Sequence, residues 1–394
     1  MHRMSLLTVV LALALTGCAQ TKMPNQKEQA KKHWNDARAS VLFGLAHDQY
    51  KSGNFDKCRI TLNEALKLSP DNAKLHVLSA KLAIEQNQLE LAEKELGTAR
   101  EKDPKGAEAD YLSGVVAQRW QKPEAAYGYY TSASEKEPTE LAYVLARAEM
   151  LVAMDRSPEA LSMLQEKVVY FEHSAVIRHA VGQILVQQRR YSEGADMLRQ
   201  ASVLASDDVS IREHLAMAYY FNHQYREACD QFARVLKSQG TEKRAELHLV
   251  MGQCQLQLDR LPDARANFEA AARIDPSSIE AWNHLSETAL RGNDLHRAEL
   301  SLRKSLALDA NNSEAQLLLG YLRLRQDRLP DALAAFTRAS QLDRSDTVSL
   351  CMVGYVLQKT GKPEQAMRFY AVALKMRPRD EMASKLMASV DLND

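Results

Sequence analysis

With 394 residues the chain is too long for one hydrophobic core, so the sequence predicts several domains or a repeat array. Its 51 basic and 51 acidic residues balance, which leaves no net charge to draw the protein to nucleic acid. Because glycine and proline are few and helix-forming residues are abundant, a mostly helical fold is expected.

The N-terminus has the layout of a signal peptide. A short basic start precedes the apolar residues 6–15, a length that suits a signal core and is too short to span a bilayer. The following Leu15-Thr16-Gly17-Cys18 resembles the lipobox of bacterial lipoproteins. The resemblance implies that residues 1–17 are removed and that Cys18 becomes the lipidated first residue, anchored by several acyl chains. A plain secretory signal would leave Cys18 unexplained.

The residue after that cysteine is Ala19. In Gram-negative lipoproteins an Asp at this position typically retains the protein at the inner membrane. Its absence favours the outer membrane, with the protein facing the periplasm.

Residues 18–38 are expected to link the anchor to the first repeat. Five basic residues against two acidic ones give residues 19–38 a net charge of +3. The stretch therefore either touches anionic lipid head groups or is a solvated tether. The helical spacing of Trp34, Ala37 and Val41 predicts a helix that forms or extends a cap on the array.

From Ala46 onward a small residue recurs every 34 residues, with a single two-residue slip. A second small residue follows twelve positions later, and a large apolar residue follows four after that, as in Cys58 and Leu62 of the first unit. A fixed period of this length predicts a repeat array. The first small residues of the ten units are Ala46, Ala80, Gly114, Ala148, Gly182, Ala216, Gly252, Ser286, Gly320 and Gly354.

Each unit is predicted to contain two amphipathic helices, A and B. In the first unit helix A is expected over 40–51 and helix B over 56–68, with a turn at Gly53 and a stop at Pro70. The small residues should let the two helix axes come close, while the large residue fills the adjoining groove.

This pattern with its closing proline resembles the tetratricopeptide repeat (TPR). The resemblance implies an all-α fold, an α-solenoid superhelix of ten TPR units over residues 39–380, with a capping helix over 381–394. The units are 39–72, 73–106, 107–140, 141–174, 175–208, 209–242, 245–278, 279–312, 313–346 and 347–380, with a two-residue insertion at 243–244.

Two places depart from the pattern. Unit four has Lys167 where Ala is usual and ends in 168–172 without a proline, and the segment 238–244 carries the two extra residues. Each departure bends the superhelix, separates subdomains, or is sequence drift with unchanged packing. Cys229 and Cys254 fall on neighbouring predicted helices, and the sequence leaves a disulfide between them open.

No catalytic constellation is evident. The H-E-x-x-H, G-x-S-x-G, Walker A and G-x-G-x-x-G motifs do not occur, and the histidines are scattered. His173 and His179 lack metal-ligand spacing, while His214 and His248 look like ordinary helix residues. The protein is therefore not expected to be an enzyme, and no metal, cofactor or small-molecule substrate is expected.

The resemblance to TPR proteins implies that helix A lines a concave groove for protein or peptide partners. Aromatic side chains there are candidate anchors, although core packing is favoured for Tyr220. The candidate groove residues are Phe43, Tyr50, Tyr111, Tyr220, Tyr321 and Tyr355.

These observations favour a membrane-anchored scaffold that binds other cell-envelope proteins. Analogy with lipid-anchored TPR proteins suggests a role in pilus or secretion-system assembly. The alternative is a non-catalytic regulatory subunit or adaptor of a cell-wall or polysaccharide enzyme.

Overall fold

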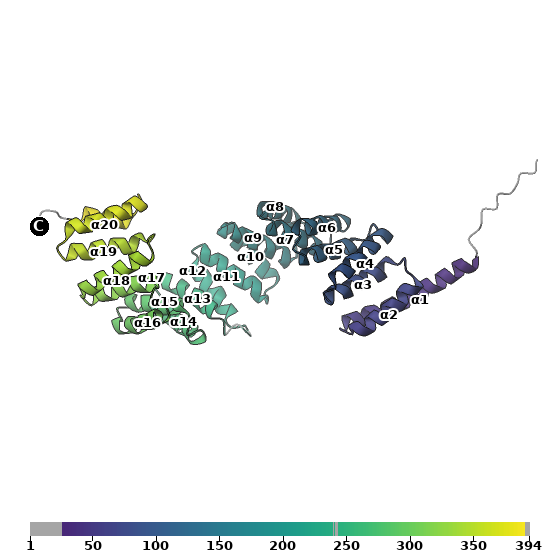
Figure 1. Ribbon diagram of the computed structural model, residues 1–394, viewed down its shortest axis with the longest axis horizontal. Coiled ribbons are helices and arrows are strands. Elements are labelled where there is room, and N and C mark those ends of the chain that lie inside the picture. Colours follow the sequence, from purple (N-terminus) through teal and green to yellow (C-terminus); the bar gives the residue numbers. More distant parts are fainter. Residues whose placement is uncertain (1–25, 239, 241–242, 391–394) are drawn as a thin grey trace, which may run out of the picture. The chain divides into compact units, whose positions relative to one another are not determined.

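The computed structural model describes residues 26–238, 240 and 243–390, and the predicted signal peptide and Cys18 lie outside this range. Regular structure in the described residues is α-helical throughout, in 21 helices. The chain divides into two compact units, of which the first ends at Leu164 and the second begins at Gln165. The fold is thus all-α, as predicted, and each unit is a stack of helical hairpins (Figure 1).

The first unit contains the hairpins up to the middle of α8. Its helices are α1 (Gln26–Lys51), α2 (Phe55–Leu68), α3 (Ala73–Glu85), α4 (Leu89–Lys102), α5 (Ala107–Arg119), α6 (Pro123–Lys136), α7 (Leu141–Ala153) and α8 (Ser157–Val168). The division within α8 falls beside Lys167, where the sequence departs from its period. Of the three interpretations of that departure, the separation of subdomains agrees with this division.

The second unit contains the remaining helices. They are α9 (Ala175–Gln187), α10 (Tyr191–Leu204), α11 (Val209–Phe221), α12 (Tyr225–Val235), α13 (Ala245–Gln257), α14 (Leu261–Ile274), α15 (Ile279–Arg291), α16 (Leu295–Leu308), α17 (Ser313–Arg325), α18 (Leu329–Leu342), α19 (Thr347–Lys359), α20 (Pro363–Met376) and α21 (Glu381–Ala388). The insertion at 243–244 lies inside this unit, where α12 packs on α13. The part of the predicted cap after residue 390 lies outside the described residues.

Odd-numbered helices from α1 to α19 are A helices, and even-numbered helices from α2 to α20 are B helices. In the repeats from α1 to α6 and from α9 to α20, helix A packs on helix B of its own repeat, and within each unit helix B packs on the next helix. Successive A helices also touch directly, for example α3 with α5 and α15 with α17. An arginine near the end of some A helices strengthens this contact. Arg291, for example, donates to the carbonyl of Leu256 at 3.3 Å, near the end of the preceding A helix.

Every A helix ends in the same left-handed turn. One residue per repeat has a φ between 55° and 73°, and the next N–H bonds back to a carbonyl five residues earlier, as from Gln88 to Ala83 at 2.8 Å. This is the Schellman motif, which closes the helix end. The left-handed residues are Gly53, Asn87, Gln121, Asp155, Arg189, His223, Asp259, Asn293, Asp327 and Gly361.

The core of each hairpin is a contact between a small residue on helix A and a large one on helix B. Tyr130, Phe268, Phe336 and Tyr370 are fully buried against Gly114, Gly252, Gly320 and Gly354 respectively. A tyrosine in this place needs a polar partner for its hydroxyl. Helix A supplies a glutamine in both cases, at 2.7 Å for Tyr130 with Gln118 and at 3.1 Å for Tyr370 with Gln358.

Helix α1 is the first helix of the described array, and it extends the first repeat toward the N-terminus. The sequence predicts a helix here that either forms or extends a cap on the array, and α1 is a single continuous helix that extends it. Its Val41 is 75% exposed. In every later repeat the matching residue is at most 8% exposed, because helices pack against it on both sides. The matching residues are Leu75, Ala109, Tyr143, Ile177, Ile211, Leu247, Ala281, Ala315 and Ser349.

Candidate protein-binding surface

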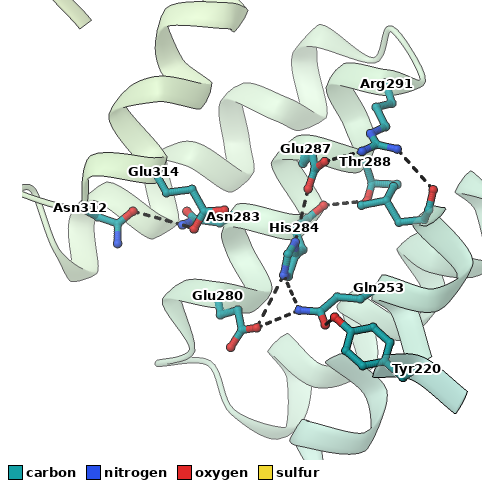
Figure 2. A network of polar contacts seen from close by, with 11 residues as sticks. Tyr220, Gln253, Glu280, Asn283, His284, Glu287, Thr288, Arg291, Asn312 and Glu314 are labelled. Carbon is teal, nitrogen blue, oxygen red and sulfur yellow. Dashed lines mark hydrogen bonds and ion pairs between the residues drawn. The ribbon is translucent and has the colours of Figure 1, made fainter. Parts of the chain in front are cut away.

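A line of polar and aromatic side chains crosses five successive A helices of the second unit, from α9 to α17. We call it the A-helix ladder. Its hydrogen bonds between helices join residues that lie 27 to 35 positions apart along the chain, which is close to one repeat. The ladder consists of His179, Gln183, His214, Tyr220, Gln253, Glu280, Asn283, His284, Glu287, Arg291, Asn312 and Glu314, and Figure 2 shows all of these from Tyr220 onward.

Gln253 on α13 joins the helices on either side of it. The hydroxyl of Tyr220 on α11 donates to its Oε1 at 3.0 Å. Its Nε2 donates to Glu280 Oε1 at 3.0 Å and lies 2.9 Å from the Nε2 of His284, both on α15 (Figure 2). One amide on α13 therefore fixes a tyrosine of α11 and a carboxylate and an imidazole of α15, which holds the exposed edges of these groups in place.

His284 is the centre of the network on α15. Its ring stacks on Phe268 with the centroids 4.9 Å apart, and its side chain is 16% exposed. The Nδ1 lies 3.4 Å from Glu287 Oε2, and the Nε2 lies 3.6 Å from Glu280 Oε1. Burial alone would lower the pKa of His284, but the surrounding carboxylates outweigh burial and raise that pKa.

Glu287 is in turn held by His284 and Arg291. The hydrogen bond with His284 lowers the pKa of Glu287 against the effect of burial, and Arg291 lowers it further. The guanidinium of Arg291 lies 2.8 Å from Glu287 Oε1. This carboxylate is therefore already paired, whereas Glu280, with a side chain 57% exposed, faces solvent.

Asn283 carries the ladder from α15 to α17. It is 1% exposed, and its amide nitrogen donates to Asn312 Oδ1 at 3.1 Å and to Glu314 Oε2 at 2.9 Å. Its amide oxygen accepts from Ser305 at 2.6 Å. Asn312 also caps α17 by accepting from the N–H of Ala315 at 2.8 Å. The buried amide is thus satisfied on both sides and fixes the distance between two repeats.

Two histidines begin the ladder on α9 and α11. His179 Nε2 lies 3.1 Å from His214 Nδ1, and Gln183 Nε2 lies 3.0 Å from His214 Nε2. Burial lowers the pKa of His179, and the neighbouring imidazole lowers it further. Both effects favour a neutral His179 at neutral pH.

Three of the predicted groove residues lie in the second unit. Tyr220 belongs to the ladder. Tyr321 and Tyr355 come together against the same core cluster, with the ring of Tyr321 edge-on to Phe336 at 5.3 Å. The ammonium of Lys359 lies 5.4 Å from the ring centroid of Tyr355. All three tyrosines are half-buried, so each packs on the core and keeps one part exposed.

The other three lie in the first unit. Phe43 and Tyr50 on α1 pack against one cluster, and the Tyr50 hydroxyl donates to Glu85 of α3 at 3.4 Å. Tyr111 on α5 lies between Tyr130 and Tyr143, with ring centroids 5.5 and 4.8 Å away. These three side chains are also half-buried.

The sequence interpretation missed most of the ladder. It set His179 aside because His173 and His179 lack metal-ligand spacing, and it interpreted His214 as an ordinary helix residue, although 179 and 214 are 35 residues apart, almost one repeat. Gln253 and His284 are 31 residues apart, and the sequence interpretation proposed no role for either of them. The ladder could have been found by comparing polar residues about one repeat apart, because such residues lie on successive A helices. Comparing residues within a single helix does not reveal these pairs.

Three hollows lie elsewhere on the second unit. The largest, about 850 Å³, adjoins α20 and Met387 of α21. The other two, about 290 and 330 Å³, lie between α14, α15 and α16 and share Arg265 and Arg297. Arg265 is paired with Glu269 at 3.8 Å, four residues later in the chain, and Arg297 is paired with Asp294 at 3.2 Å, three residues earlier. None of the six predicted groove residues lines these three hollows.

Among the described residues, no group of three or more histidine, cysteine, aspartate or glutamate side chains is arranged to hold a metal ion. Among the helices from α1 to α21, none combines the length and the apolar character needed to cross a membrane.

Some solved structures of low sequence identity match most of the chain, and others match about half of it. The yeast Tom70 structure is 13% identical with a TM-score of 0.47, and the match covers 90% of this chain and 88% of that one. A thermophilic TPR protein of Thermus thermophilus is 20% identical with a TM-score of 0.41, over 46% of this chain and 98% of that one.

Curated relatives are distant. A TPR repeat-containing protein of Methanocaldococcus jannaschii is 20% identical over 392 residues, which is 85% of this chain and 69% of the relative. A TPR repeat-containing protein of Pseudomonas aeruginosa is 26% identical over 151 residues, 38% of this chain. The match covers 26% of that relative's length.

Two family models match the chain. The model of the C-terminal domain of cilia and flagella-associated protein 70 matches residues 202–393. The tetratricopeptide repeat model matches residues 50–115, which lie within the array of 34-residue helical hairpins described above. The chain therefore contains tetratricopeptide repeats.

Proposed function

We propose that the protein is a scaffold of the cell envelope, lipid-anchored at Cys18 to the periplasmic face of the outer membrane. Its partner is an envelope protein or peptide, in the assembly of a pilus or a secretion system. TPR proteins bind other proteins or peptides and are typically non-catalytic scaffolds, which supports the binding role. The lipobox-like residues before Cys18 support the anchor.

The A-helix ladder is the observation that carries the binding proposal. Its hydrogen bonds join side chains of five helices, so these groups lose little further freedom when a partner binds. Glu280 offers an exposed carboxylate, and Phe221 beside Tyr220 offers a ring that is 38% exposed. The surface therefore suits a segment with a basic group and an apolar anchor residue.

In-cell crosslinking followed by mass spectrometry of the captured partners tests this function. The proposal expects pilus or secretion-system components among the captured proteins. Capture of a cell-wall or polysaccharide enzyme would instead support the alternative role as a non-catalytic adaptor. Capture of no envelope protein would contradict both roles.

Two charge reversals on neighbouring helices make the capture experiment specific. Glu280→Lys changes the ladder on α15, while Glu269→Lys changes a similarly exposed carboxylate on α14, where 50% of the side chain is accessible. We expect Glu280→Lys to reduce capture at least tenfold and Glu269→Lys to leave it unchanged. If Glu269→Lys abolishes capture and Glu280→Lys does not, the partner binds at the hollows between α14 and α16.

The anchor has its own test. Cys18→Ser removes the thiol that lipidation requires, so the protein should be released from membranes or remain unprocessed. Metabolic labelling with a fatty acid and membrane fractionation report both effects. Unchanged lipidation in the variant would contradict the anchor.

A further inference from the structure

Two thiols lie together where repeats six and seven meet. Cys229 on α12 and Cys254 on α13 belong to one buried cluster with Phe232 and Leu247, and they are 4% and 0% exposed. Their helices pack on one another, and each thiol shifts the pKa of the other. Neither thiol has a place in the ladder.

The repeat explains why these two positions touch. Cys229 follows the small residue of its B helix, and Cys254 follows that of the next A helix by two. One repeat earlier the same positions hold Ala195 and Ala218, which also pack in one cluster. The contact is thus a close approach of small side chains between helix B and the next helix A. Here both small side chains are cysteines.

This junction is also the irregular one in the second unit. Helix α12 has 11 residues, whereas the preceding and following B helices have 14, and the chain then carries two extra residues before α13. The connection lacks the proline-terminated turn found at several other junctions. A covalent link between α12 and α13 would hold the two repeats together independently of that connection.

We propose that Cys229 and Cys254 form a disulfide when the protein meets a disulfide oxidant. The occurrence of that reaction in the cell rests on the proposed envelope location, because disulfides form in oxidising compartments. The oxidant is any disulfide, of a protein or a small molecule, that can reach the junction while α12 and α13 are open or still folding.

The reaction proceeds by two exchanges. The Cys229 thiolate attacks one sulfur of the oxidant, which breaks the oxidant's disulfide and releases one thiol. The Cys254 sulfur then attacks the Cys229 sulfur of the mixed disulfide and releases the second thiol. Two cysteine thiols are oxidised and one disulfide is reduced, and the two thiol protons end on the released thiols.

The environment selects Cys229 as the first nucleophile. The Cys254 thiol lowers the pKa of Cys229, because it stabilises the neighbouring thiolate. The Cys229 thiol in turn raises the pKa of Cys254, and burial raises it further. Cys229 is also the more exposed of the two.

Oxidation of the purified, reduced and non-acylated chain from Ala19 to Asp394 tests the pair, because this chain contains every described residue. After incubation with oxidised glutathione, free thiols are counted in denaturant and non-reduced peptides are mapped by mass spectrometry. We expect the four thiols to fall to two, with one peptide linking Cys229 to Cys254. The melting temperature of the oxidised protein should be higher than that of the reduced protein by roughly 2–4 °C.

Matched controls come from the other two buried cysteines, which lie in other clusters. The double variant Cys58→Ala/Cys351→Ala should still lose two thiols and gain the same thermal shift. Cys229→Ala should form no internal link and show no shift. Four free thiols in the oxidised wild type, or a link between any other pair, would overturn the inference.

The cellular arm separates this inference from the proposed location. Protein from cells lysed in an alkylating agent should carry the Cys229–Cys254 link. If the link forms with glutathione but is missing in cells, the envelope location is contradicted while the pair itself is supported. If it fails to form with glutathione, the inference falls whatever the location.

Discussion

The ring of Phe336 on α18 occupies the space that a Cβ atom on Gly320 of α17 would need. The same relation holds between Gly252 and Phe268, where the added Cβ would lie 2.6 Å from the ring. Repeats with alanine in the place of the glycine mostly have leucine opposite, as in Ala80 with Leu96. The two positions compensate each other in volume, so hairpin packing is set by the pair.

Gly320→Ala should therefore destabilise the second unit by about 1–3 kcal/mol, and Gly320→Leu by more, because the Phe336 ring has to move. Adding Phe336→Leu to Gly320→Ala should recover part of the loss, since this pair already packs in other repeats. Urea unfolding followed by circular dichroism measures both effects. Gly44→Ala is the control, because nothing lies near its added Cβ. If Gly320→Ala unfolds at the same urea concentration as the wild type, the assigned packing of Phe336 against Gly320 is wrong.

The left-handed turns predict a stabilising change. Arg189 is exposed and has a φ of 61°, a conformation that costs a non-glycine residue about 1–2 kcal/mol. Arg189→Gly should therefore raise the unfolding midpoint by the equivalent of about 1 kcal/mol. Asn87→Gly should gain less, because asparagine tolerates this region. Equal effects of the two substitutions in urea unfolding would argue against strain at Arg189.

His76 predicts a pH dependence in the first unit. Its Nδ1 lies 2.7 Å from Glu95 Oε2 and its Nε2 lies 2.8 Å from the carbonyl of Pro70, so the protonated ring can donate to both. The hydrogen bond with Glu95 raises the pKa of His76, against the effect of burial. A raised folded-state pKa stabilises the fold fully below the unfolded value of about 6.5, and this contribution disappears as pH rises through the folded value.

His76→Gln should therefore lose more stability at pH 6 than at pH 9, relative to wild type at the same pH. Thermal melts at the two pH values measure this difference, and His33→Gln on the exposed part of α1 is the control. A larger loss at pH 9 would contradict the assignment of His76 as the charged partner of Glu95.

The exposed Val41 gives a matched pair with a buried residue at the same repeat position. Ile211→Ser removes a side chain that is 2% exposed and should cost about 2–4 kcal/mol. Val41→Ser should change stability by less than about 0.5 kcal/mol, because that side chain is 75% exposed. Urea unfolding compares the two. A large loss for Val41→Ser would mean that another segment covers α1.

Much of the helical hairpin follows from the 34-residue period, since the pattern reports the buried faces directly. The sequence predicts helix B of the first repeat over 56–68, and the structure has α2 at Phe55–Leu68. The turn at Gln121 and Arg189 was less predictable, because neither residue favours a left-handed backbone. There the packing of the two helices imposes the turn against local preference.

The ladder could not be predicted from single helices. Gln253 looks like a solvent-facing residue until the stacking places Tyr220 and His284 on either side of it. Such contacts depend on the offset between repeats, which the period alone does not give. Cys18 and the membrane anchor remain a prediction from the lipobox-like residues, outside the described part of the chain.

Site-specific photo-crosslinking in cells tests most directly whether the A-helix ladder binds the partner. A photoreactive amino acid is placed at Glu280 on α15 or at Glu269 on α14, which are comparably exposed. The account predicts a discrete adduct with an envelope protein from Glu280 and none from Glu269. An adduct from Glu269 alone, or from neither position, would contradict the ladder as the binding surface.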